Sequence, residues 1–144
     1  MTAKPTYETT RPMRFFNGLM KGLVRLGIGP KNTWVLSVPG RKTGKLRSTP
    51  VTLVEEGGQR WLVAPYGPVD WVKNARAAGK VGLRRGKHSE IVPVRELGPE
   101  EAAPVLKLYV ERVPHPRPYF DNGPDAPAEA FIAEAHRHPV FLLG

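Results

Sequence analysis

Residues 33–65 read TWVLSVPGRKTGKLRSTPVTLVEEGGQRWLVAP, in which apolar runs alternate with turns that contain glycine. β-Branched and aromatic residues are frequent in these runs, as they are in β-strands. We therefore expect strands at 33–38, 46–55 and 59–65, the first two joined by the turn PGRKTGK and the last two by a hairpin turn at 56–58. Consecutive hairpins predict a mainly antiparallel sheet.

The flanking sequence predicts helices beside this sheet. Pro68 and Gly79 have the positions at which helices begin and end, and two acids after Pro99 suit the positive end of a longer helix. We expect an amphipathic helix at 12–27, a short helix at 68–79, and a hairpin with strands at 80–85 and 89–97. A longer helix at 99–112, a last helix at 128–136 and a terminal strand at 140–143 complete the prediction. The predicted fold class is α+β, with a closed or half-closed antiparallel sheet. The predicted organisation is a flexible arm at 1–11 followed by one domain at 12–144.

The net charge of +9 is concentrated in one part of the chain. Residues 1–54 contain ten Lys and Arg and one acid, whereas residues 55–144 contain twelve of each sign. Such asymmetry indicates an anionic partner, which the residues alone leave open as phosphate, a carboxylate tail, a lipid head group or nucleic acid. The absence of cysteine excludes disulfides, iron–sulfur clusters and thiol nucleophiles. With no signal peptide or long apolar span in view, we expect a cytoplasmic protein, and contact with the inner face of a membrane through residues 12–27 is left open.

The basic segment, residues 40–50, reads GRKTGKLRSTP and combines four cations with three hydroxyls. Glycine allows backbone N–H groups to approach an anion, arginine binds an anion through two N–H groups, and lysine adds a point charge. The segment is not a nucleotide-binding P-loop, because Leu46 stands where Ser or Thr would follow the lysine. We favour an anion site, with a solvated basic hairpin turn as the alternative.

A second candidate is the segment 64–74, APYGPVDWVKN, where a strand stops and a helix begins. Free backbone amides and an aromatic ring at one place could seat a flat ring with polar edges. A plain turn with Trp71 in the core is the alternative. The four histidines show no metal-ligand spacing, and no nucleophile elbow or dinucleotide-binding glycine pattern occurs. Glu55 and Glu56 should point apart at a strand end, unlike a catalytic pair of carboxylates. Taken together, the sequence indicates neither a hydrolytic site nor a metal site.

The run GRKTGKLRSTPV at 40–51, with LVAPYG at 62–67 and DWVKNARAAG at 70–79, resembles the deazaflavin-dependent nitroreductases of actinobacteria. The resemblance extends over about residues 12–112. It implies a split β-barrel related to the flavin-binding pyridoxamine-oxidase group. It also implies the cofactor F420, an 8-hydroxy-5-deazaflavin with a phosphate and an oligoglutamate tail, with FMN as the less favoured cofactor. The activity implied is that of an oxidoreductase, which transfers a hydride from reduced F420 to a small quinone, enone or nitro compound.

Carried over position by position, the resemblance implies two groups of cofactor-binding residues. Those at the phosphate and tail carboxylates are Arg41, Lys42, Thr43 and Arg47, with Gly44 in the same turn. Those nearer the ring are Ser48, Pro50, Ala64, Pro65, Tyr66, Gly67, Trp71 and Asn74. The nitroreductases also place a tyrosine-rich C-terminal segment over the substrate. In this region the chain has Tyr119 and Phe120, and Tyr119 is the candidate catalytic residue, as a proton donor.

Other function classes compete with this assignment. Some relatives in the superfamily bind lipids, so a lipid- or fatty-acid-binding split barrel that does not use the deazaflavin is the main alternative. Nucleic-acid binding is favoured by charge alone, and the sequence contains no known nucleic-acid-binding pattern. The partner expected is therefore a small-molecule substrate and not a nucleic acid, and a homodimer is left open.

Overall fold

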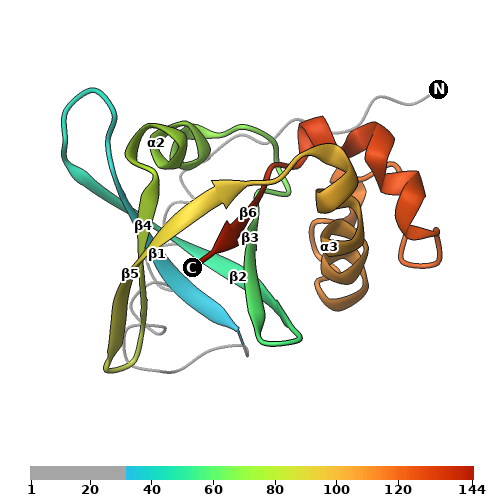
Figure 1. The fold of residues 1–144 in the computed structure, drawn as a ribbon, viewed down its shortest axis with the longest axis horizontal. Coiled ribbons are helices and arrows are strands. Elements are labelled where there is room, and N and C mark those ends of the chain that lie inside the picture. The colour runs from blue at the N-terminus through green and yellow to red at the C-terminus, as the bar shows by residue number, and fades with distance from the viewer. Residues whose placement is uncertain (1–31) are drawn as a thin grey trace.

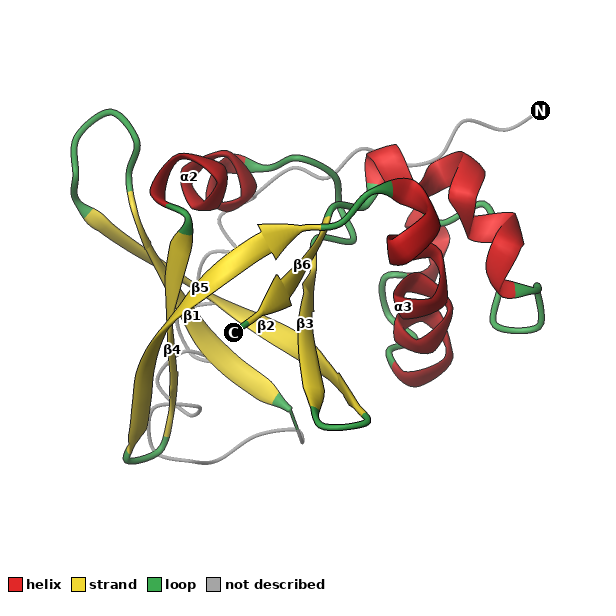
Figure 2. Ribbon diagram, viewed as in Figure 1, coloured by secondary structure: helices red, strands yellow, loops and turns green. Residues whose placement is uncertain are grey.

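The computed structural model describes residues 32–144, and its strands close into one antiparallel barrel (Figures 1 and 2). The arm predicted at 1–11 and the helix predicted at 12–27 lie outside the described residues. Around the barrel the strand order is β1-β2-β3-β6-β5-β4, and β4 pairs with β1 to complete the circle. The strands are β1 (Thr33–Pro39), β2 (Leu46–Glu56), β3 (Gln59–Val63), β4 (Lys80–Arg85), β5 (His88–Glu96) and β6 (Val140–Leu143). The predicted α+β class and split-barrel type of fold are confirmed.

Alternation along the strands builds the barrel interior. Leu36 on β1, Leu53 on β2 and Leu62 on β3 point inward and are at most 2% exposed. Their neighbours in sequence point to the other face, because side chains alternate along a strand. The third predicted strand ends two residues earlier than expected, at Val63. Its continuation is prevented by Pro65, which has no N–H to donate to a sheet.

A second core lies outside the barrel, against β3 and β6. Here α3 (Pro99–Arg112) and η2 (Ala128–Arg137) pack on the outward side chains of these strands. Figure 1 shows α3 beside this part of the barrel. The buried sheet residues of this cluster are Val54 on β2, Val63 on β3 and Val140 on β6, and Phe131 on η2 is completely buried in it. The predicted last helix is therefore present, but it has the tighter 3₁₀ form. Since both faces of this part of the sheet are covered, its strands carry apolar residues on both sides.

The helix α2 (Asp70–Ala78) covers one end of the barrel (Figure 1). Val72 and Ala75 are fully buried and belong to the same cluster as the barrel interior. The β1–β2 turn and the β3–α2 loop both lie at this end, on either side of α2 (Figure 1). Within residues 32–144, no helix is long and apolar enough to cross a membrane.

Candidate functional site

The turn of the basic segment is tight and depends on glycine. The Gly40 N–H donates to the Lys45 carbonyl at 2.8 Å, and the Gly44 N–H donates to the Gly40 carbonyl at the same distance. Gly44 has φ +74°, a backbone conformation that residues other than glycine rarely adopt. A Cβ atom on Gly40 would lie 3.2 Å from Thr43 Oγ1. The turn therefore has one defined shape, as an anion site requires.

Asn74 attaches this turn to α2. Its side-chain oxygen accepts the Arg41 backbone N–H at 3.0 Å and the Arg41 Nη1–H at 2.8 Å. The carboxylate of Asp70, one turn earlier on α2, lies 3.8 Å from Arg41 Nη2. Asn74 is only 3% exposed, so its role in the structure is to hold Arg41 from beneath. Sequence reasoning had assigned Asn74 to the cofactor, and it did not anticipate an acid beside Arg41.

The other cations of the segment are available to a ligand. Lys42, Lys45 and Arg47 are exposed, and their side chains have no hydrogen bond or ion pair with any residue of the described part of the chain. The guanidinium of Arg47 lies over the turn, with Nε 3.8 Å from where a Cβ of Gly40 would be. A cluster of cations without partners is expected to bind an anion. These residues therefore fit the phosphate and carboxylates of the predicted cofactor.

Ser48 and Pro50 occupy the opposite face of β2 from Arg47. Arg47 lies opposite Val38, which points into the barrel, whereas Ser48 lies opposite Ser37 on the outer face. The hydroxyls of Ser37 and Ser48 are 2.9 Å apart. The structure thus divides the predicted residues of β2 between two faces, and one ligand would have to pass over the end of the strand to contact both.

The β3–α2 loop turns sharply just before the helix. The Ala64 N–H donates to the Pro139 carbonyl, and the Ala64 side chain is buried in the core. Gly67 has φ +101°, and its Cβ position would be 3.6 Å from the Arg137 carbonyl. Pro65 and Gly67 are buried, which leaves Tyr66 as the partly exposed side chain among residues 64–67. Trp71 is half-buried, with its ring centroid 6.0 Å from that of Phe141 in the core.

Tyr119 meets Tyr66 across this loop. Tyr119 ends η1 (Arg117–Tyr119), and its ring contacts the Tyr66 ring edge-to-face, with centroids 4.8 Å apart and an angle of 76°. The structure therefore brings the predicted proton donor to the loop predicted to line the ring. Tyr109 is buried nearby, where burial and the neighbouring Tyr66 raise the pKa of its phenol well above the usual value.

Sequence reasoning missed a buried Glu134–His138 pair behind the same loop. His138 is 2% exposed and Glu134 is 1% exposed. His138 Nδ1 is 2.8 Å from the Pro65 carbonyl oxygen, and Nε2 is 2.8 Å from Glu134 Oε1. Burial lowers the pKa of His138, and the hydrogen bonds to Glu134 and Pro65 offset only part of that effect. No local signal marks this pair in the sequence, because His138 lies beyond the helix predicted at 128–136 and follows the last residue of η2 in the structure.

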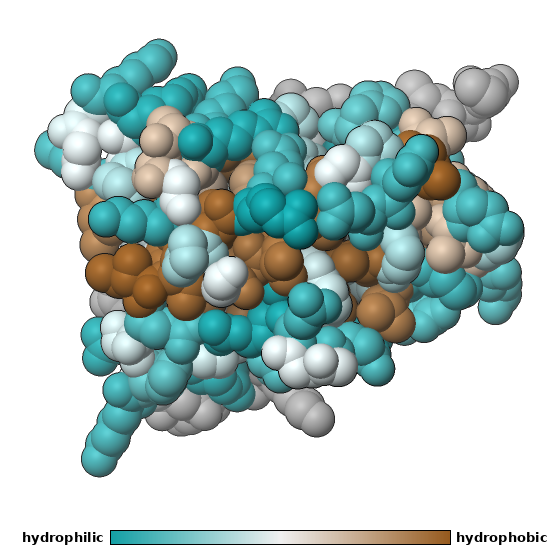
Figure 3. Space-filling model, viewed as in Figure 1, coloured by the Kyte–Doolittle hydropathy of each residue, from teal (hydrophilic) through white to brown (hydrophobic). Residues whose placement is uncertain are grey.

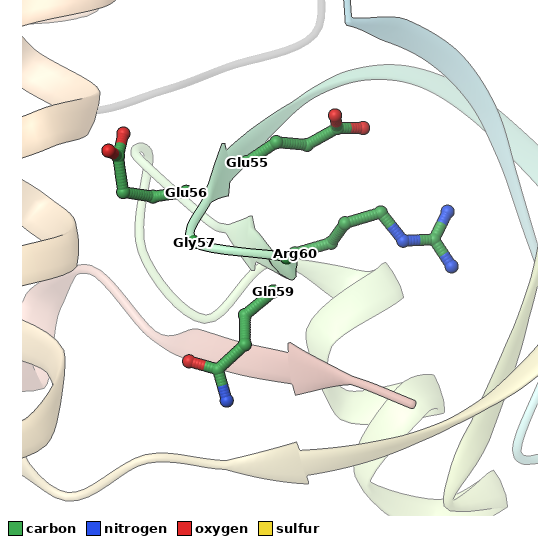
Figure 4. Close-up of a pocket in the computed structure, with 6 residues that line it drawn as sticks. Glu55, Glu56, Gly57, Gln59 and Arg60 are labelled. Carbon is green, nitrogen blue, oxygen red and sulfur yellow. The ribbon is translucent and has the colours of Figure 1, made fainter.

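The hollow at the β2–β3 turn is not part of this site. It is lined by residues 55–60, whose long side chains fan outward instead of converging (Figure 4). Glu55 and Glu56 point apart, as expected for neighbours at a strand end. Arg60 is already paired with Glu90. The hollow therefore has no arrangement of groups suited to catalysis.

Comparison with known proteins identifies the relatives of this fold. The family model described as F420H(2)-dependent quinone reductase matches residues 10–121. A solved structure described as an F420-H2 dependent reductase (FDR-A) is 26% identical, with a TM-score of 0.55 over 79% of this chain and 95% of the other.

Two further solved structures show the same fold at lower identity. One described as a domain-swapped dimer is 24% identical, with a TM-score of 0.60 over 92% of this chain and 99% of the other. One described as a putative pyridoxamine 5'-phosphate oxidase from Listeria innocua is 11% identical, with a TM-score of 0.51 over 78% and 82%. No curated protein matches the chain.

Proposed function

Since the chain belongs to the F420H(2)-dependent quinone reductase family and is an F420-dependent oxidoreductase, we propose that it reduces a small quinone at the α2 end of the barrel. The observation that carries the proposal is the group of exposed cations beside α2, Lys42, Lys45 and Arg47, which have no side-chain partner within residues 32–144. An oligoglutamate tail offers several negative charges to such a group, whereas FMN offers one phosphate. When bound, the reduced deazaflavin supplies the hydride.

The basic segment binds and orients the charged part of the cofactor in this proposal. Arg41 is held by Asn74, so its guanidinium is already oriented before the cofactor arrives. Lys42 and Arg47, with Thr43 and Gly44 in the same turn, contact phosphate and carboxylate oxygens. Pre-orientation reduces the conformational entropy that binding would otherwise cost.

The β3–α2 loop and Tyr119 serve the reacting end. Residues 64–67 line the edge of the ring through the Tyr66 side chain and backbone groups, with Trp71 at the start of α2. A quinone that receives a hydride takes up one proton to become a quinol. The Tyr119 hydroxyl is the group proposed to donate it, because the Tyr119 ring already rests against Tyr66. Enones and nitro compounds need the same hydride and proton and are the related acceptors.

The test is a fluorescence titration with F420 and with FMN, followed by an assay of reduced F420 oxidation with a soluble quinone, enone and nitroaromatic compound. We expect F420 to bind more tightly than FMN, and a rise in salt to weaken binding because exposed cations are screened. Lys87→Ala is the charge-matched control for alanine variants of the basic segment, since it removes one exposed cation from a different turn, between β4 and β5. Equal or tighter binding of FMN contradicts the proposal. Purified protein that carries an acyl chain and ignores F420 would favour the lipid-binding alternative.

Two further partners are proposed, a second copy of the chain and a membrane surface. A structural neighbour described as a domain-swapped dimer supports a homodimer, which light scattering would test. Membrane contact through residues 12–27 concerns a segment outside the described residues, and sedimentation with anionic vesicles would test it.

A further inference from the structure

The buried Glu134 carboxylate is surrounded by N–H donors. Oε1 accepts the Asp121 backbone N–H at 2.9 Å, and Oε2 accepts the Asn122 backbone N–H at 2.9 Å and its side-chain N–H at 2.6 Å. With His138 Nε2 at 2.8 Å from Oε1, each carboxyl oxygen of Glu134 has two nitrogen atoms within hydrogen-bonding distance. Arg137 lies at 3.8 Å, at the edge of the cluster. Glu134 therefore fixes the chain directly after Tyr119 and Phe120.

His138 reaches from this carboxylate to the loop on the other side. The Pro65 carbonyl can only accept a hydrogen bond, so His138 Nδ1 carries a proton and donates it. The imidazole is stacked on Phe120, with centroids 3.8 Å apart and planes 14° from parallel. Phe120 is itself 2% exposed, so the ring of His138 has one available orientation.

These contacts join the two segments that carry Tyr66 and Tyr119. Pro65 precedes Tyr66, and Phe120 follows Tyr119, so His138 contacts the residue next to each tyrosine. The edge-to-face contact between the two tyrosines therefore rests on a buried polar connection directly behind it. A partly satisfied network at this depth would be costly, but in residues 32–144 no buried side-chain polar atom lacks a partner.

We propose that His138, held by Glu134, is a positioning residue that fixes the Pro65–Tyr66 part of the β3–α2 loop against Tyr119. This inference rests on the proposed function, because the β3–α2 loop is the part of the chain proposed to line the cofactor ring. The His138 and Glu134 side chains are buried and act through that loop. Specifically, the hydrogen bond from Nδ1 to the Pro65 carbonyl sets the loop, whereas the bond from Nε2 to Glu134 sets the imidazole.

Two substitutions at one position separate these bonds. The side-chain nitrogen of Asn stands near the place of Nδ1, so His138→Asn keeps a donor for Pro65 and loses Glu134. The side-chain amide of Gln reaches the place of Nε2, so His138→Gln keeps a partner for Glu134 and loses Pro65. Both variants lose the ring stacked on Phe120, so both should melt at a lower temperature than wild type.

Cofactor affinity at a temperature where both variants are folded is the first readout. We expect His138→Gln to weaken F420 binding about five- to tenfold, the equivalent of one net hydrogen bond, and His138→Asn to weaken it less than about threefold. A merely structural role would weaken binding in proportion to the loss of melting temperature in both variants. That result, or wild-type affinity in His138→Gln, would overturn the proposal.

Hydrogen exchange of residues 64–69 without cofactor is the second readout and does not depend on the proposed function. The loop amides should exchange faster in His138→Gln than in His138→Asn, and equal rates would refute the positioning role. If wild-type protein fails to bind F420, the proposed function fails, while the exchange experiment still decides the link. If His138→Gln does not fold, NMR of the wild-type imidazole replaces it. The Nδ1–H signal should shift when F420 binds, and an unchanged signal would refute the proposal.

Discussion

Asn74→Ala tests whether the basic segment is oriented from α2. The substitution removes the oxygen that accepts two N–H groups of Arg41, at 3.0 and 2.8 Å. A neutral hydrogen bond contributes about 1 kcal/mol net, and one to a charged donor about 1.5–3 kcal/mol. The Arg41 side chain is 30% exposed, so water replaces part of the second bond. We therefore expect a loss of about 2 kcal/mol in the free energy of unfolding, which lowers the melting temperature by about 4–8 °C in a protein of this size.

The same substitution should weaken F420 binding about tenfold, because Arg41 is no longer oriented toward the ligand. Calorimetric melting and fluorescence titration measure the two effects separately. Asn74→Asp supplies both acceptors and should restore the melting temperature, but its negative charge beside an anion site should leave F420 binding weak. Lys73→Ala is the matched control on α2, since Lys73 is exposed. A melting temperature within about 1 °C of wild type and an unchanged dissociation constant for Asn74→Ala would refute the reasoning.

Three further outcomes are expected. Arg47→Ala should weaken F420 binding about ten- to a hundredfold and Lys45→Ala less than about threefold, and equal effects in a titration would mean that the segment acts only through its total charge. Tyr119→Phe should lower kcat for quinone reduction with little change in KM, because the ring contact is kept and the hydroxyl is lost; an unchanged kcat would exclude it as the proton donor. Burial raises the pKa of Glu90, but the hydrogen bonds from His88 and Arg60 outweigh this and lower it, so the unfolded chain takes up the proton first. Stability should therefore fall as the pH drops below about 4.5, less steeply in Glu90→Gln, and parallel curves in acid melts would contradict this.

Local patterns were sufficient to predict the strands and the longer helices of residues 32–144, but not the short helix η1. The apolar, β-branched run TWVLSV, the glycines after Glu56 and the acids after Pro99 each act over a few residues, so strands and helices could be placed from them. Closure was left undecided because it depends on pairing between distant strands, such as Arg60 with Leu143 and Val94 with the same residue. No local pattern encodes such a register.

The candidate site was predictable where composition alone marks it. A run of cations between glycines is visible without a structure, but the partner of each cation is not. Asn74 is 33 positions from Arg41 and could be assigned to a ligand as readily as to a neighbouring side chain. His138 is 73 positions from Pro65, and its role depends on a carbonyl group that every residue has.

Some apolar residues on the surface of the barrel are exposed, which the sequence pattern could not predict. Figure 3 shows an apolar band across one face, between hydrophilic margins. Ile91 on β5 is 75% exposed and Leu46 at the start of β2 is 68% exposed. Alternation predicts which residues of a strand share a face, but not which of the two faces is covered.

The place of β6 in the barrel has a consequence for how the chain folds. This four-residue strand pairs with β3 on one side and β5 on the other, yet it is the last strand in sequence order. During synthesis, β3 and β5 therefore have unpaired edges until residues 140–143 have been added. Unpaired edges invite pairing with other chains, and contacts between distant residues form slowly. Barrel closure should therefore be a late step of folding, which follows the pairing of the earlier strands.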